Sequence, residues 1–243
     1  CVDNSKKNDL EVFRTLNEGL VQSITTISSS NNTIYKALES RLNDPQYSKA
    51  EKWQPKAYQV KIISDSIIKF ISGLKNELQN ATGSNEELYS KGNMAVVNRL
   101  FDEKGKDLYN RLINYRKDIL SVDSSLRNQF EHTVKLVTEK FDYTKNDTKE
   151  FAKFFFNKIP AIAAMAVLNR FENDVKINEN DFILFCLNQT HNIFCGYFTK
   201  TALIIGQSVN YVKGGDYIEI NGGVGSFSVI AKPIMKIDGK IVQ

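Results

Sequence analysis

Residues 159–168 read Ile159-Pro160-Ala161-Ile162-Ala163-Ala164-Met165-Ala166-Val167-Leu168, an unbroken apolar run that opens on a proline. Proline suits the first turn of a helix, because its missing N–H would have no intrahelical partner there. A helix that is apolar on every side at its start must be surrounded by protein or lipid, and a bilayer span needs about 20 apolar residues. We therefore predict that this run begins the central helix of a bundle, which continues to about Gln189.

Four amphipathic patterns precede this run. Apolar residues recur at spacings of three and four within residues 10–42, 60–78, 97–119 and 126–141, which is the period of a helix that buries one face. Pro45 and Pro55 lie where we expect the first helix to end and the second to start, and Thr82-Gly83-Ser84-Asn85 separates the second from the third. Long helices with short connections predict an antiparallel helical bundle over residues 1–192.

The pattern changes after His191. Residues 193–205 are rich in β-branched and aromatic side chains, and glycine clusters at 214–215 and 221–225 predict turns. Short strands between such turns indicate an antiparallel β-domain over residues 193–243. About 50 residues make a thin sandwich, so we expect only the start of that module here. The predicted fold class is α+β and mainly α.

The charge pattern bears on the class of partner. The 32 Lys and Arg residues are scattered among 28 Asp and Glu residues, which leaves a net charge of +4. Proteins that bind nucleic acid usually gather their basic side chains on one face. A solvated surface of mixed charge is the simpler interpretation, and we expect no nucleic-acid partner.

The three cysteines bear on the compartment. Cys1 fits the acylated first residue of a mature bacterial lipoprotein, and a fragment boundary explains it about as well. Cys186 lies in the apolar run 182–187, where burial as a small hydrophobic side chain is the default. A disulfide between Cys186 and Cys195 in an oxidising compartment is the alternative.

The sequence contains almost no motif of catalytic or metal-binding chemistry. His132 and His191 lie outside any nucleophile motif, and no C-x-x-C or H-E-x-x-H spacing is present. The glycines of residues 222–225 precede a strand pattern, so a turn or bulge is the sensible interpretation and a phosphate-binding loop is not. We expect no enzymatic activity, and no catalytic residue, metal ion or cofactor.

Four segments carry a family resemblance. They are residues 10–20 (LEVFRTLNEGL), residues 57–78, the proline-led helix with Asn173-Asp174-Val175 and Glu179, and the segment 210–217 (NYVKGGDY). In their order and spacing they resemble the GldM/PorM family, the periplasmic core component of the Bacteroidetes type IX secretion and gliding machinery. The resemblance covers most of the chain.

The resemblance implies a helical bundle followed by β-domains, assembled as an elongated homodimer that crosses the periplasm. It further implies energy transfer from an inner-membrane motor with GldL-like subunits to outer-membrane ring components. Family members carry a transmembrane helix just before the segment that resembles residues 10–20, so the expected membrane anchor is such a helix or a lipid on Cys1. The alternative is an envelope lipoprotein whose β-domain binds a peptide or protein partner.

Overall fold

A computed structural model of the chain describes residues 2–83, 93–134, 136, 148–190, 198–207, 213–215, 220–228, 235–237 and 240–242. The chain divides into two compact units, residues 1–191 and 192–243. Each unit is described below by itself.

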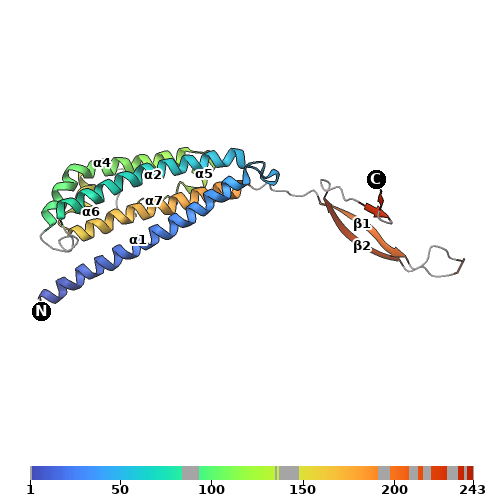
Figure 1. Cartoon of the computed structure of the whole chain (residues 1–243), viewed down its shortest axis with the longest axis horizontal. Helices are drawn as coiled ribbons and strands as arrows, with labels where there is room; N and C mark the ends of the chain where they lie inside the picture. Colours follow the sequence, from blue (N-terminus) through green and yellow to red (C-terminus); the bar gives the residue numbers. More distant parts are fainter. Residues whose placement is uncertain are drawn as a thin grey trace. The chain divides into compact units, whose positions relative to one another are not determined.

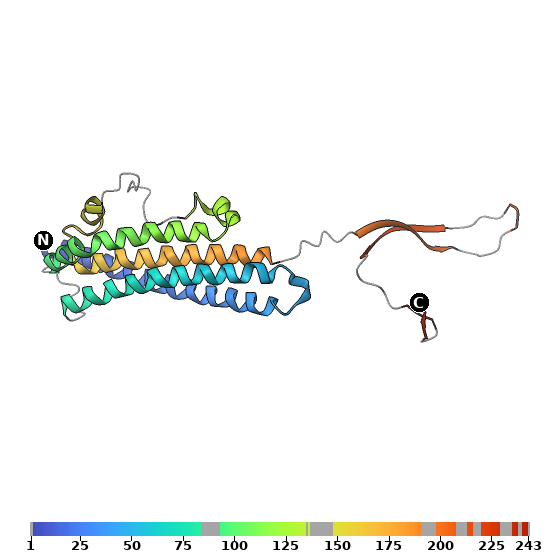
Figure 2. The ribbon, with the colours of Figure 1, turned by 90° about the horizontal axis from the view of Figure 1, so that it is seen from above.

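The first unit is helical (Figure 1). Its elements are α1 (Val2–Arg41), a 3-10 turn (Pro45–Tyr47), α2 (Ala50–Thr82), α4 (Met94–Ser121), α5 (Ser124–Phe130), α6 (Thr148–Phe156) and α7 (Ala161–Gln189). The helices α1, α2, α4 and α7 are long and lie side by side, whereas α5 and α6 are short (Figure 2). At 1.5 Å per residue, the 29 residues of α7 extend over about 44 Å. The predicted helical bundle is confirmed.

The apolar run begins α7 as predicted. Pro160 precedes the helix in an extended conformation, with φ −67° and ψ 157°. Its carbonyl accepts hydrogen bonds from the N–H groups of Ala163 and Ala164 at 3.0 and 3.1 Å. Residues 161–166 and Leu168 are all buried, because α7 packs against α1, α2 and α4. The prediction that protein encloses this helix is therefore confirmed.

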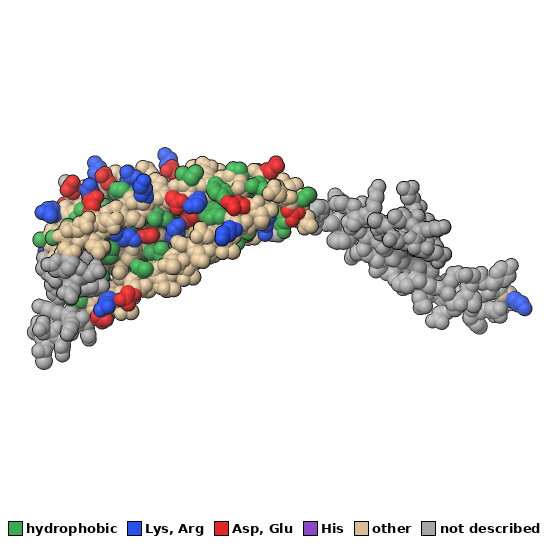
Figure 3. Space-filling view, viewed as in Figure 1, with side chains coloured by type: hydrophobic (Ala, Val, Ile, Leu, Met, Phe, Trp, Pro, Cys, Tyr) green, Lys and Arg blue, Asp and Glu red, His purple; other side chains and the backbone are tan. Residues whose placement is uncertain are grey.

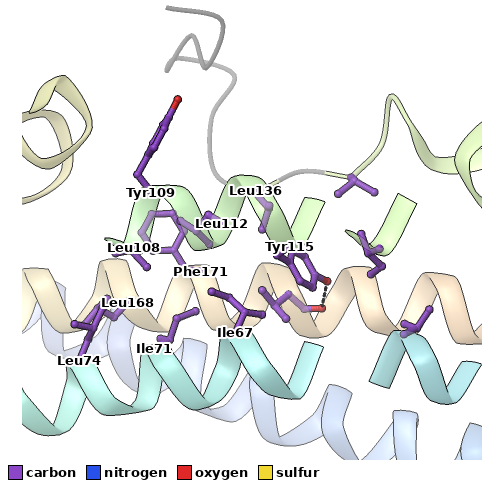
Figure 4. Packing of buried hydrophobic residues seen from close by; sticks show 14 of the residues in the cluster. Ile67, Ile71, Leu74, Leu108, Tyr109, Leu112, Tyr115, Leu136, Leu168 and Phe171 are labelled. Carbon is purple, nitrogen blue, oxygen red and sulfur yellow. Dashed lines mark hydrogen bonds between the residues drawn. The ribbon is translucent and has the colours of Figure 1, made fainter. Parts of the chain in front are cut away.

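The core lies where three long helices meet. Figure 4 shows side chains of α2, α4 and α7 interleaved there: Ile67, Ile71, Leu74, Leu108, Leu112, Tyr115, Leu168 and Phe171. The Tyr115 hydroxyl donates a 3.4 Å hydrogen bond to the carbonyl of Val175, which gives this buried phenol a partner. Burial raises the pKa of Tyr115 above its usual value, so the side chain acts as a neutral core residue.

The helix α2 runs antiparallel to α7. Lys75, near the end of α2, pairs with Glu172 near the start of α7. Trp53, near the start of α2, lies edge-on to Phe185 near the end of α7, with 5.7 Å between the ring centres. For this pair of helices the predicted antiparallel arrangement is correct.

The helix α1 runs parallel to α7, which the sequence analysis did not predict. Asn17 pairs with Asn169 in the first part of α7, and Arg41 reaches the carbonyl of Leu187 at its end. The helix α4 also runs in the same direction as α7 (Figure 2). The physical reason is that α6 packs beside the start of α4, so residue 161 lies at the end of the bundle where α1 and α4 begin (Figure 2). The predicted antiparallel arrangement is therefore wrong for the pair α1 and α7.

Two helix boundaries also differ from prediction. The helix α2 begins at Ala50, five residues before Pro55, because proline this close to a helix start removes a single intrahelical hydrogen bond. The expected helix over 126–141 ends at Phe130. Phe130 stacks on Phe182 at 4.5 Å and Val134 is buried outside the helix, so tertiary packing satisfies the apolar spacing. Residues 137–147 lie outside the described part of the chain.

The second unit contains two antiparallel strand pairs. β1 (Phe198–Gln207) pairs with β2 (Ile220–Ser228), and β3 (Met235–Ile237) pairs with β4 (Lys240–Val242). The predicted turn at residues 214–215 is present, and Gly215 has φ 102°, a conformation that favours glycine. The β-domain as a module, and the boundaries 1–192 and 193–243, stay predictions.

The glycine-rich segment 221–225 is not the predicted turn, because it lies within β2. It pairs with residues 201–206 of β1, where a register shift falls between Ile204 and Gly206. Glycine accommodates the local bend of such an irregularity because it has no Cβ. Of the two interpretations offered for these glycines, the turn is wrong, and the register shift opposite Gly222 agrees with the bulge.

Candidate functional site

Of the residues that the sequence analysis considered as sites, the structure describes His132 and Cys186, and these two lie on separate elements. His132 lies in the exposed turn that follows α5, so it does not belong to a fourth long helix. Cys1, His191 and Cys195 lie outside the described residues, and the lipid attachment at Cys1 stays a prediction. Within the described part of the chain, no group of three or more His, Cys, Asp or Glu side chains is placed to hold a metal ion.

Cys186 is a core residue of α7. Its side chain is fully buried, and this burial raises the pKa of the thiol to about 12. A thiol with a raised pKa is a poor nucleophile at neutral pH, because the thiolate is the reactive form. The disulfide between Cys186 and Cys195 stays a prediction.

Two surface hollows lie on the bundle. The first, of about 690 Å³, is lined by α4, α6 and the residue after α6, including Asp102, Lys106 and Lys153. The second, of about 560 Å³, lies between the end of α2 and the start of α4 and includes Glu77 and Glu103. None of the lining residues of either hollow belongs to α7. Neither hollow therefore reaches the central helix.

The described surface offers no single-sign patch on the face drawn in Figure 3, where blue and red side chains alternate along the bundle. Among the described helices, none alone has both the length and the apolar character of a membrane span. The bent pair α6 and α7 passes that test together, with an angle of 115° between its halves.

Several buried or half-buried polar side chains instead join the long helices to one another. The first set, called here the Lys75 group, consists of Asn17, Lys75, Asn169 and Glu172. Lys75 of α2 donates to Asn169 at 2.8 Å and pairs with Glu172, both on α7. Asn169 in turn donates to Asn17 of α1. One polar group therefore connects three helices through α7.

The second set, called here the Glu179 group, consists of Tyr35, Asp65, Lys176 and Glu179. Glu179 is 1% exposed, and its two carboxylate oxygens accept from the Tyr35 hydroxyl at 2.9 Å and from Lys176 Nζ at 2.8 Å. Lys176 Nζ also lies 4.0 Å from Asp65 on α2. Burial first, and then the Glu179 carboxylate, raise the pKa of Tyr35 well above its usual range.

Further hydrogen bonds follow the α1–α7 contact on both sides of the Glu179 group. Asn31 donates to the carbonyl of Lys176 at 3.4 Å, and Asn180 donates to the Asn31 side chain at 2.7 Å. Arg41 donates to the carbonyl of Leu187 at 2.7 Å near the end of α7, where the N–H and the hydroxyl of Thr190 donate to the same oxygen. The polar contacts of α7 with its neighbours thus extend from Asn169 to Leu187.

These groups are arranged as joints between helices. Their donors and acceptors are directed at each other, and each carboxylate is paired with an ammonium or a hydroxyl group. The sequence analysis did not single out Asn169, Lys176 or Asn180. The available signal was the recurrence of polar side chains at spacings of three and four, at positions 169, 172, 176 and 180 of this helix.

The fold and its polar joints define the class of protein: a long helical bundle whose polar side chains serve structural contacts between helices. Residues 10–188 match the family described as the GldM N-terminal domain. The chain belongs to the GldM family. A comparison with curated proteins finds no match.

The matched residues coincide with the helical bundle. They begin within α1 and end one residue before the end of α7. Membership in this family indicates a structural component of the cell-envelope machinery for type IX secretion and gliding. The expected membership in the GldM/PorM family is confirmed.

Proposed function

We propose that the chain is a non-enzymatic, force-transmitting component of the type IX secretion and gliding machinery that crosses the periplasm. The observation that carries this proposal is the family match over residues 10–188. Its physical support is the bundle itself, because four long packed helices form a stiff element that resists bending and compression. In this role the molecule needs contacts that bear load and no reactive centre.

The proposal includes an N-terminal anchor and protein partners. The anchor is a transmembrane helix ahead of α1 or a lipid on Cys1, and the partners are a second copy of the chain, a GldL-like motor subunit and outer-membrane ring components. The β-domain over residues 193–243 carries the load onward from α7. Mass spectrometry of the mature protein distinguishes the two anchors, because acylation adds the mass of the fatty acyl chains to the N-terminal residue.

The function is tested in cells that lack the endogenous protein. Complementation with the natural sequence should restore secretion and surface spreading, and complementation with Leu168→Asp should not, because a charge in the core unfolds the bundle. The matched control is Leu184→Asp on the exposed side of α7. Normal secretion and spreading in cells without the protein would refute the proposal.

The alternative function is a lipoprotein whose β-domain binds a peptide or protein partner. The observation in its favour is that, within the described strands, β1 and β2 pair only with each other, and a strand edge accepts an added strand. Cross-linking in intact envelopes, followed by capture of the chain, separates the two functions. Recovery of GldL-like and ring components supports force transmission, and recovery of one exported ligand supports the alternative.

A further inference from the structure

The entry and exit helices of the bundle, α1 and α7, are parallel neighbours. The start of α1 and the end of α7 therefore lie at opposite ends of the bundle (Figure 2). A pull between these two points acts along both helix axes and slides α1 past α7. The side-chain contacts between the two helices are then loaded together, in shear.

Apolar contact alone resists such sliding weakly. Non-directional apolar contacts allow one helix to move past another if a similar apolar surface is presented after the shift. Hydrogen bonds and ion pairs are directional, and a buried charge that loses its partner carries a large penalty. Buried polar side chains are for this reason a well-attested means of fixing the register of paired helices.

The Glu179 group meets these conditions at the α1–α7 contact. Glu179 is 1% exposed, and both of its oxygens are engaged, one by Tyr35 of α1 and one by Lys176 of α7. A displacement of α1 by one residue, about 1.5 Å, separates the Tyr35 hydroxyl from the carboxylate. Asn31, about one turn earlier on α1, holds the same register through the carbonyl of Lys176.

The contacts of α1 also concentrate the load on this joint. The helix α1 packs chiefly on α7 and only slightly on α2. Along residues 11–30 every side chain is exposed or half-buried, whereas Asn31, Ile34, Tyr35 and Leu38 are buried. The segment of α1 that contains Tyr35 is therefore the part held firmly to the bundle.

We propose that the α1–α7 contact is a shear joint whose register is locked by Tyr35, Lys176 and Glu179, and that this joint bears an axial load on the bundle. Its biological use rests on the proposed force-transmitting function. The lock itself is a mechanical property of the folded chain and is measured without the machinery.

The test is constant-force stretching of the full chain with optical tweezers. Handles are attached through azide-bearing amino acids at Glu11 on α1 and Asn188 on α7, two exposed positions. The decisive variant is the apolar triple Tyr35→Phe, Lys176→Met and Glu179→Leu. Replacement of a buried ionic group by apolar side chains of similar size commonly leaves stability unchanged or raised, so this variant separates the lock from global stability.

We expect the triple variant to retain the thermal midpoint of the natural chain and to open about tenfold faster or more at the same load, because directional contacts have been removed from the loaded joint. An unchanged opening rate would overturn the proposal. If the triple variant does not fold, Tyr35→Phe is compared with Phe151→Leu, a core change on α6 whose ring contacts involve α4, α6 and α7.

The two single variants are compared after their bulk stabilities have been measured in urea. For each variant, the increase in opening rate under load is divided by its loss of stability in urea. A larger ratio for Tyr35→Phe than for Phe151→Leu supports the proposed joint, and equal ratios refute it. If cells without the protein secrete normally while the purified chain shows the expected resistance to sliding, the proposed function alone is rejected. If the variants open no faster under load but the protein is needed for secretion, the proposed shear joint alone is rejected.

Discussion

Single buried side chains of α7 hold the three long neighbours of this helix together. Leu168 is fully buried and lies close to Leu74 of α2 (Figure 4). Leu184, on the same helix, is 42% exposed. Two leucines of one helix therefore differ chiefly in the amount of apolar surface that folding removes from water, which makes them a matched pair.

Leu168→Ala is expected to lower the free energy of unfolding by about 2–5 kcal/mol, because it removes buried methyl groups and leaves a cavity. Leu184→Ala is expected to change it by about 0.5 kcal/mol or less, as at other exposed positions. Urea denaturation followed by circular dichroism measures both values. Similar losses in the two variants would contradict the central position of α7.

Asp123 stabilises the short helix α5 in two ways. Its carboxylate accepts from the N–H of Ser125 at 2.8 Å and caps the helix, and it also pairs with Lys56 of α2. The hydrogen bond from Lys56 is the main cause that lowers the pKa of Asp123 below its ordinary value of 3.8. The charged carboxylate is thus favoured in the folded state.

Asp123→Ala is expected to lower the free energy of unfolding by about 1 kcal/mol at neutral pH, the usual effect of losing a cap. Because the folded-state pKa is lowered, this stabilisation is complete above pH 3.8 and is lost as the pH falls through the folded-state pKa. The difference between the natural chain and the variant should therefore shrink in acid. Asp118→Ala, at an exposed position of α4, is the control, and a constant difference down to strong acid would contradict the assignment.

At the scale of elements, the contact between α4 and α6 depends on one glycine. A Cβ at Gly105 of α4 would lie 2.7 Å from the Cβ of Ala152 on α6, closer than two such atoms approach in proteins. The close approach of the two helices allows Phe101 of α4 to stack on Phe156 of α6 at 3.6 Å. Glycine inside a helix costs about 1 kcal/mol relative to alanine, and the packing of α6 offsets this cost.

Gly105→Val is expected to lower the free energy of unfolding by about 1–3 kcal/mol, because the added methyl groups force α6 away from α4. Addition of Ala152→Gly removes the opposing Cβ and should recover part of this loss. A double-mutant cycle by urea denaturation measures the coupling between the two positions. Strictly additive effects would show that the two residues do not meet.

At the scale of the whole molecule, the division into residues 1–191 and 192–243 predicts an independent bundle. The helices α1, α2, α4 and α7 form one core, and α7 is complete at Gln189. A chain that ends at residue 191 retains every residue of that core. Its stability should therefore depend little on the segment that follows.

Truncation after residue 191 is expected to shift the thermal midpoint of the bundle by less than about 4 °C, which corresponds to about 1 kcal/mol for a domain of this size. Truncation after residue 174, inside α7, should abolish cooperative unfolding, because it removes Phe182 and Ile183 from the core. Scanning calorimetry of the three chains measures both effects. A cooperative transition in the shorter truncation would contradict the central role of α7.

The sequence by itself determined the existence of the long helices, the enclosed start of α7 and the family, because apolar spacing and a leading proline are local features that act before any packing. It did not determine that α1 runs parallel to α7, since this direction depends on which end of the bundle α6 packs against. The termination of α5 at Phe130 and the pairing of the buried Glu179 with Tyr35 and Lys176 were likewise decided by tertiary contacts. A polar side chain in a helix is normally solvated, and only the approach of α1 and α2 gave these residues partners inside the protein.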